Sequence, residues 1–230
     1  MGRPVADKPA LIDSLLRSGR RAQDRGDLFG AQRSLDQALQ AAHQTEDYER
    51  MAEAVRALGQ VREAIRESAT KSRRVAVVDE RIPQGRDLKP GCYLVQPPRV
   101  GVDGRTLREL AAAAGIPALV VVREPTTRAG LWPVVALGPI TVRTRVKPPG
   151  AAGKGGTSGG VKKSAGKPTP TWMKGAIEAL GEAAVEGAPQ APASVRVAAL
   201  LERLGTVPES SILHETLHEA CLAAAKNGRA

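Results

Sequence analysis

The chain has 230 residues, of which 42% are hydrophobic but only 2% aromatic, and it carries a formal net charge of +10. This length allows one sizeable domain or several small ones, and the composition requires cores built mainly from Ala, Val and Leu. The composition argues against a base-stacking platform, and no run approaches the roughly 20 apolar residues that a transmembrane helix needs.

The cysteines and the N-terminal segment indicate the compartment. Cys92 and Cys221 lie far apart, so we expect neither a disulfide framework nor a Cys-x-x-Cys site. The first residues are charged and lack the apolar core of a signal peptide. We therefore expect a cytoplasmic protein that does not bind a membrane.

The first 70 residues have a helical pattern. Apolar residues recur at three- and four-residue steps over 11–42, which is typical of amphipathic helices. The sequence RGD at 25–27 interrupts this pattern and indicates a tight turn between two antiparallel helices. The stretch 48–67 predicts a third helix, so we expect a helical module over 1–70.

Small and apolar residues in this module follow a repeat-like spacing: Gly19, Ala22, Gly26, Asp27, Leu28, Ala31, Leu35 and Ala38. In this respect residues 11–66 resemble a tetratricopeptide repeat, which implies a helical hairpin with small residues where its helices touch. A partial second match at Leu58 and Gly59 comes about six residues late for a tandem repeat. The chain also lacks the several repeats that make a binding groove, and a plain three-helix bundle is the alternative.

The middle of the chain changes to short, β-branched runs bounded by Pro or Gly, typical of strands. We predict strands at 74–78, 92–96, 117–124, 132–137 and 140–146, with a helix at 103–115 after the second strand. This order predicts a small mixed sheet over 71–147, with one right-handed crossover helix and a closing hairpin.

The remaining chain divides into a tract without core residues and a helical end. Residues 148–170 are rich in Gly, Pro and Lys and predict a disordered linker. Residues 171–230 contain three amphipathic stretches and predict a C-terminal helical bundle. The expected fold class is therefore α+β in several parts: a helical module, a small sheet domain, a linker and a second bundle.

The sequence HETLH matches the His-Glu-x-x-His signature of zinc peptidases at His214 and His218. A catalytic zinc needs a third protein ligand, yet only twelve residues follow His218, and Cys221 is the one weak candidate. On a helical wheel both histidines flank a stripe of apolar residues. We therefore expect an amphipathic helix with border histidines, without a metal, rather than a metallopeptidase.

A glycine-bearing turn joins the second strand to the predicted helix. Gly101 and Gly104 in this turn could let backbone N–H groups cradle a phosphate. However, Asp103 would place its carboxylate where an anion would bind, and the turn has no complete nucleotide-binding motif. We expect Asp103 to be an ordinary helix N-cap.

The basic excess is concentrated after the helical module. Residues 71–150 hold 14 Lys or Arg against 6 Asp or Glu, and 151–170 hold four Lys and no acid. If the strands that flank the helix are parallel, their loops meet at one sheet edge, the usual ligand position in open α/β sheets. Six arginines are the candidate anion-binding residues, four in these loops and two on the last strand: Arg99, Arg105, Arg123, Arg128, Arg143 and Arg145. A solvated, arginine-rich rim is the alternative.

No nucleophile, base and orienting group come together in the sequence, since all three histidines lie outside the sheet domain. We therefore expect a non-enzymatic scaffold or adaptor, without cofactors, that binds a protein partner through its helical modules. The alternative is sequence-nonspecific binding of nucleic acid or another polyanion through 71–170. A zinc metallopeptidase is the third reading, and the oligomeric state does not follow from the sequence.

Overall fold

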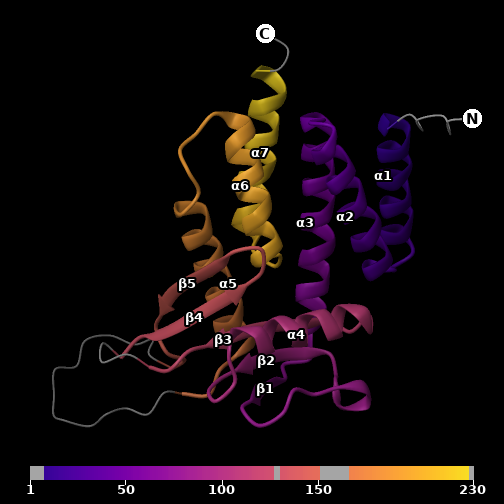
Figure 1. Ribbon diagram of the computed structural model, residues 1–230. Coiled ribbons are helices and arrows are strands. Elements are labelled where there is room, and N and C mark those ends of the chain that lie inside the picture. Colours follow the sequence, from indigo (N-terminus) through magenta and orange to yellow (C-terminus); the bar gives the residue numbers. More distant parts are fainter. Residues whose placement is uncertain (1–7, 127–129, 151–165, 228–230) are drawn as a thin grey trace, which may run out of the picture. The chain divides into compact units, whose positions relative to one another are not determined.

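The computed structural model describes residues 8–126, 130–150 and 166–227, shown in colour in Figure 1. These residues contain seven α-helices and one five-stranded mixed sheet, which confirms the predicted α+β class. They divide into two compact units. The helical unit comprises Met1–Glu67, Gly138–Ile140 and Gly181–Ala230, and the sheet unit comprises Ser68–Leu137 and Thr141–Leu180.

The domain boundaries expected from the sequence stay predictions, and most of the predicted linker 148–170 lies outside the described residues. No helix among the described residues is long and apolar enough to cross a membrane.

The first described elements, α1 (Lys8–Asp24) and α2 (Leu28–Gln44), form the predicted helical hairpin. Gly26 has a φ of 77°, which favours glycine, and Asp27 caps α2 by accepting a 2.8 Å hydrogen bond from the Gly30 N–H. A Cβ on Gly19 would lie 2.6 Å from Leu35 Cγ. A small residue is therefore required where the two helices touch.

The helical unit also contains α6 (Ala193–Thr206), α7 (Ser211–Asn227) and most of α3 (Tyr48–Lys71). Helix α5 (Pro170–Glu186) contributes residues to both units. The core of the helical unit is made of fully buried aliphatic side chains from helices at both ends of the chain: Ile12, Leu35, Val55, Leu58, Leu200, Leu213 and Leu217. Residues far apart in sequence are therefore buried within the same unit.

The sheet unit is built on β1 (Val75–Val78), β2 (Gly91–Val95), β3 (Ala118–Arg123), β4 (Trp132–Leu137) and β5 (Thr141–Val146). The strands lie side by side in chain order. Strands β1, β2 and β3 are parallel, whereas β4 is antiparallel to both of its neighbours. The predicted strands, the crossover between parallel strands and the closing hairpin are all present.

Helix α4 (Gly101–Ala113) forms the crossover and packs against β3 and β4. It begins before the predicted N-cap: Val100 is the capping residue, and the Asp103 carboxylate accepts a 2.8 Å hydrogen bond from the Val100 N–H. A Cβ on Gly104 would lie 2.1 Å from Val122 Cγ2, and one on Gly101 would lie 2.6 Å from Leu137 Cδ1. The two glycines thus allow α4 to approach the sheet closely.

Candidate functional site

The HETLH histidines lie on α7 and both contact the backbone of α3. His214 is buried, with 7% exposure, and its Nδ1 and Nε2 atoms lie 3.3 Å from the Val55 carbonyl oxygen and 3.1 Å from that of Pro208. His218 Nδ1 lies 3.0 Å from the Ala52 carbonyl oxygen. The expectation that both histidines merely border the buried stripe is wrong for His214, because α7 packs a second side against α3.

These contacts direct the ring nitrogens at carbonyl oxygens. A metal ion at His214 would have to displace its contacts to Val55 and Pro208. Cys221 is fully buried, and burial raises the pKa of its thiol to about 12, so the thiolate that a metal binds is disfavoured. Among the described residues, no group of three His, Cys, Asp or Glu side chains could hold a metal ion.

Beside the histidines, two adjoining cavities follow α3 within the helical unit. One has a volume of about 550 Å³ and lies between α3 and α7. The other has a volume of about 650 Å³ and is lined by α1, α3 and α7. Arg56, Gln60 and His218 line both cavities, so we treat them as one depression and call it the α3 groove.

The α3 side of this groove is a stripe of polar side chains: Glu49, Glu53, Arg56, Gln60, Glu63 and Glu67. Their alternating four- and three-residue spacing places them on one helical face. The apolar periodicity of the segment, on which its prediction as a helix rests, does not indicate this stripe. The same spacing, applied to the charged residues, would have found it.

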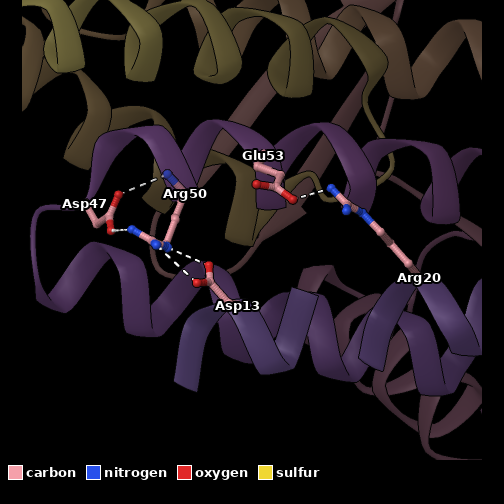
Figure 2. Close-up of polar contacts among 5 residues, drawn as sticks. All are labelled: Asp13, Arg20, Asp47, Arg50 and Glu53. Carbon is pink, nitrogen blue, oxygen red and sulfur yellow. Dashed lines mark hydrogen bonds and ion pairs between the residues drawn. The ribbon is translucent and has the colours of Figure 1, made fainter. Parts of the chain in front are cut away.

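Ion pairs tie α1 to α3, and one of them, between Arg20 and Glu53, lines the groove (Figure 2). The Arg50 guanidinium donates two hydrogen bonds to the Asp13 carboxylate, at 2.7 and 3.1 Å, and one of 2.7 Å to Asp47. Arg20 pairs with Glu53 farther along the same two helices. The bonds from Arg50 lower the pKa of Asp13, and those carboxylates raise the pKa of Arg50.

Arg62 lines the cavity between α3 and α7, and Arg66 lies one helical turn farther along α3. Arg66 is buried, donates to the Glu209 carbonyl at 3.0 Å and to Ser211 Oγ at 2.8 Å, and pairs with Glu63. Arg62 donates from Nη2 to Asp36 at 2.9 Å, and its side chain is only 12% exposed. Its Nε and Nη1 atoms are buried and have no hydrogen-bond partner. Buried polar atoms usually have hydrogen-bond partners, so these two buried N–H donors beside the groove are exceptions.

The predicted anion-binding arginines lie in the sheet unit, where they make different contacts. Arg99 donates to the Glu80 carbonyl and pairs with Asp103, whereas Arg105 pairs with Glu109 along the exposed side of α4. Arg123 donates to Gln96 and Thr126, both at 3.2 Å. Arg128 lies outside the described residues.

Arg123 also belongs to an aromatic cluster. Its guanidinium carbon lies 4.4 Å from the ring centroid of Trp132, and this ring meets Trp172 edge to face at 5.5 Å. Burial lowers the pKa of Arg123. The Arg123 guanidinium therefore already contacts side chains of the sheet unit itself.

The last two candidates lie on β5. Arg143 and Arg145 are exposed on one face of the strand, whereas Val142 on the other is buried. Arg143 Nε lies 3.1 Å from a carboxylate oxygen of Glu124, and both arginines line a shallow cavity of about 540 Å³. The structure thus brings Arg143 and Arg145 together, while Arg105 points along α4 toward Glu109.

Comparisons with protein-family models, curated proteins and solved structures find no match to this chain. The tetratricopeptide resemblance of residues 11–66 accordingly stays a prediction.

Proposed function

We propose that this chain is a non-enzymatic adaptor whose helical unit binds a segment of another protein along the α3 groove. The observation that carries the proposal is the pair of adjoining cavities of about 550 and 650 Å³ on one face of α3. Three helices supply the lining, so the groove has side walls as well as a floor. An elongated depression of this kind suits a peptide segment better than a compact metabolite.

The dimensions support a segment of several residues. From Glu49 to Glu67 the polar stripe spans 18 helical steps, or about 27 Å at 1.5 Å per residue. An extended chain covers that length with about eight residues. Such a segment would contact side chains from α1, α3 and α7 together, a basis for specific recognition.

The test is a quantitative pull-down with the full-length chain and two matched variants. Gln60 is exposed and lines both cavities, so Gln60→Trp should fill the groove. Gln40 is exposed on α2 and lines neither cavity, so Gln40→Trp is the control. We expect partners that are retained by Gln40→Trp and lost by Gln60→Trp. Equal recovery with the two variants would argue against the groove as the binding site.

A second function, polyanion binding by the sheet unit, is favoured by strand direction. Because β4 is antiparallel to both β3 and β5, β5 runs in the same direction as β1, β2 and β3. The ends of β2, β3 and β5 therefore bring Arg99, Arg123 and Arg145 to one edge of the sheet. An exposed Arg145 and the following Lys147 offer cations for phosphates there.

This second function is tested by titrating the full chain with a labelled mixed-sequence DNA duplex at two salt concentrations. Binding should weaken by roughly one log unit per log unit of salt for each phosphate contacted. Arg145→Glu should reduce both the affinity and the salt dependence, whereas Arg33→Glu on the exposed side of α2 should change them less. No binding at the lower salt concentration would exclude this function.

A further inference from the structure

Strand β5 forms one edge of the five-stranded sheet and is paired with β4 on one side only (Figure 1). We propose that an extended segment of a partner protein, with acidic side chains at alternate positions, adds to the sheet as a further strand beside β5. This binding surface lies within the sheet unit and does not depend on the α3 groove.

Two hydrogen bonds fix which backbone groups of β5 are used by the sheet. The Glu124 N–H donates to the Pro133 carbonyl oxygen at 2.9 Å, so the odd-numbered residues of β4 direct their backbone groups toward β3. The even-numbered residues of β4 consequently bond to β5, and the Gly138 N–H continues this pattern by donating to the Ile140 carbonyl at 3.0 Å. In the observed register, the even-numbered residues of β5 therefore face β4.

The odd-numbered residues of β5 point their backbone groups away from β4. These residues are Thr141, Arg143 and Arg145, and all three are exposed. Their N–H and C=O groups have no hydrogen-bond partner within 8–126, 130–150 and 166–227. The Lys147 carbonyl, next in the same phase, accepts a 2.8 Å bond from Trp172 Nε1, so the open stretch ends at Arg145. At about 3.4 Å per residue it is roughly 14 Å long.

Donors and acceptors alternate along this open edge, which favours a peptide strand as the ligand. An extended peptide presents N–H and C=O groups at the same spacing and can bond to both kinds of group on β5. The phosphodiester groups of a nucleic acid accept hydrogen bonds but donate none, so they would leave the β5 carbonyl oxygens unmatched. The backbone of β5 therefore favours a protein partner at this edge.

The side chains beside the open edge favour an acidic partner. Arg143 is paired with Glu124, whereas Arg145 has no ionic partner in the described part of the chain. Both arginines lie on one face of the strand and line the cavity of about 540 Å³, which leaves space beside them. Alternate side chains of an added strand would lie about 5 Å from these residues on the same face. An acidic side chain there would form an ion pair with Arg145.

The same charges disfavour two other occupants of the edge. If β5 paired with β5 of a second copy, arginine would lie opposite arginine, and like charges directly opposite one another destabilise a strand pair. The chain's own segment 151–165 contains three Lys and no acidic residue, so it does not offer the complementary charge. A strand of opposite charge from another protein meets both the backbone and the side-chain requirements.

The probes are labelled peptides of about nine residues, long enough to extend past the open stretch at both ends. One alternates Glu with Thr, and its matched control alternates Lys with Thr. Anisotropy titration of the full chain should show the Glu peptide binding roughly ten-fold more tightly than the Lys peptide, because Lys side chains would lie beside Arg145.

Two N-methylated forms of the Glu peptide test the backbone bonds without changing the charge. Along an extended strand the N–H groups of alternate residues face opposite sides, so one form is methylated at every Glu and the other at every Thr. Strand addition uses only one of these sets. One form should therefore lose about ten-fold or more in affinity, the effect of losing several hydrogen bonds, and the other should bind nearly as well as the unmodified peptide.

A charge reversal tests the role of Arg145. Arg145→Glu should weaken binding of the Glu peptide by roughly ten-fold and strengthen binding of the Lys peptide, an exchange of preference that loss of structure would not produce. Arg86→Glu makes the same charge change at an exposed residue of the sheet unit outside β5. It should change both affinities by less than about two-fold, since exposed charges away from the ligand are largely screened. A thermal melt of each variant establishes that it is folded.

Unequal binding of the two methylated forms, together with the exchange of preference in Arg145→Glu, supports strand addition. Equal binding of the two forms, with displacement by a DNA duplex, would overturn it and leave a polyanion site at these arginines. Failure of the Glu peptide to bind the parent chain would overturn it as well. So would self-association of the chain that Arg145→Glu abolishes, because the edge would then pair with a second copy.

Gln60→Trp separates this edge from the α3 groove. The substitution should leave the affinity for the Glu peptide unchanged, because Gln60 lies on α3 in the helical unit. A large loss with Gln60→Trp would assign the peptide to the groove and overturn strand addition at β5. Failure of the Glu peptide to bind, with Gln60→Trp still losing a cellular partner, would leave the adaptor function intact.

Discussion

Gly104 sets how closely α4 approaches the sheet. A Cβ at this position would lie 2.1 Å from Val122 Cγ2, and Val122 is a buried strand residue that cannot move away without disturbing the core. The glycines that the sequence suggested as a phosphate cradle thus have a packing role. Two glycines next to a capping carboxylate are compatible both with a phosphate cradle and with close helix packing. The local sequence could therefore not distinguish these two roles.

Gly104→Ala should destabilise the protein by about 1–3 kcal/mol, because the added methyl group forces the helix away from β3. Gly175→Ala is the control: Gly175 lies in helix α5 with nothing within 4 Å of its added Cβ. That change should stabilise the protein by about 0.5–1 kcal/mol, since alanine favours the helix. Urea denaturation of both variants measures the difference, and effects of equal sign would contradict the packing argument.

The two cysteines should be unreactive in the folded protein. Cys92 and Cys221 are both fully buried, and burial raises their thiol pKa values to about 11 and about 12. Because the thiolate is the reactive form, a thiol reagent at neutral pH should react slowly until denaturant is added. Rapid modification of either thiol in the native protein would show that its burial is wrong.

At the level of elements, ion pairs join α1 to α3, two of the helices that line the groove. Arg50 of α3 lowers the pKa of Asp13 of α1, so the ionised carboxylate is favoured in the folded state. A carboxyl group of this kind stabilises the fold above its unfolded-state pKa. The contribution is lost as the pH falls through the lower, folded-state pKa.

Asp13→Asn should therefore lower the melting temperature at neutral pH, and the difference from the parent protein should shrink as the pH falls through the acidic range where Asp13 titrates. Asp24→Asn removes an exposed carboxylate of the same helix and serves as the control for general charge effects. Thermal melts followed by circular dichroism across acidic pH give the comparison. A difference that persisted after protonation would assign Asp13 another role.

The elements themselves were largely predictable from sequence. Alternating β-branched runs bounded by Pro or Gly gave all five strands, because both signals are local. The start of α4 was placed too late, since a carboxylate such as Asp103 serves equally well as a cap or three residues into a helix. The α3 groove was not predicted, because its lining comes from α1, α3 and α7. Local sequence patterns do not indicate which helices pack side by side.

At the level of the molecule, one compact unit contains segments from both ends of the chain. The contacts that join them are specific: His214 of α7 lies against Val55 of α3, and Arg66 of α3 donates to Ser211 of α7. Leu213 and Leu217 of α7 are fully buried. Without the C-terminal helices, the face of α3 that carries Val55 and Arg66 would lose these partners.

Fragments 1–150 and 166–230, produced separately, should therefore bind each other and gain helicity and thermal stability on mixing. The physical reason is the apolar and hydrogen-bonded surface of α3 that α7 covers. Isothermal titration and circular dichroism measure the association. If each fragment unfolds cooperatively and the two do not bind each other, the two ends of the chain are independent domains.

This arrangement has a consequence for the newly made chain. At 5–20 residues per second, a ribosome needs roughly 7–30 s to proceed from the end of the α3 stripe at Glu67 to Ser211 at the start of α7. Throughout that interval Val55 and the buried Arg66 of α3 lack their C-terminal cover, while every strand of the sheet is completed. We expect ribosome-bound chains stalled before α7 to expose this face to chaperones, and release of the complete chain to close it.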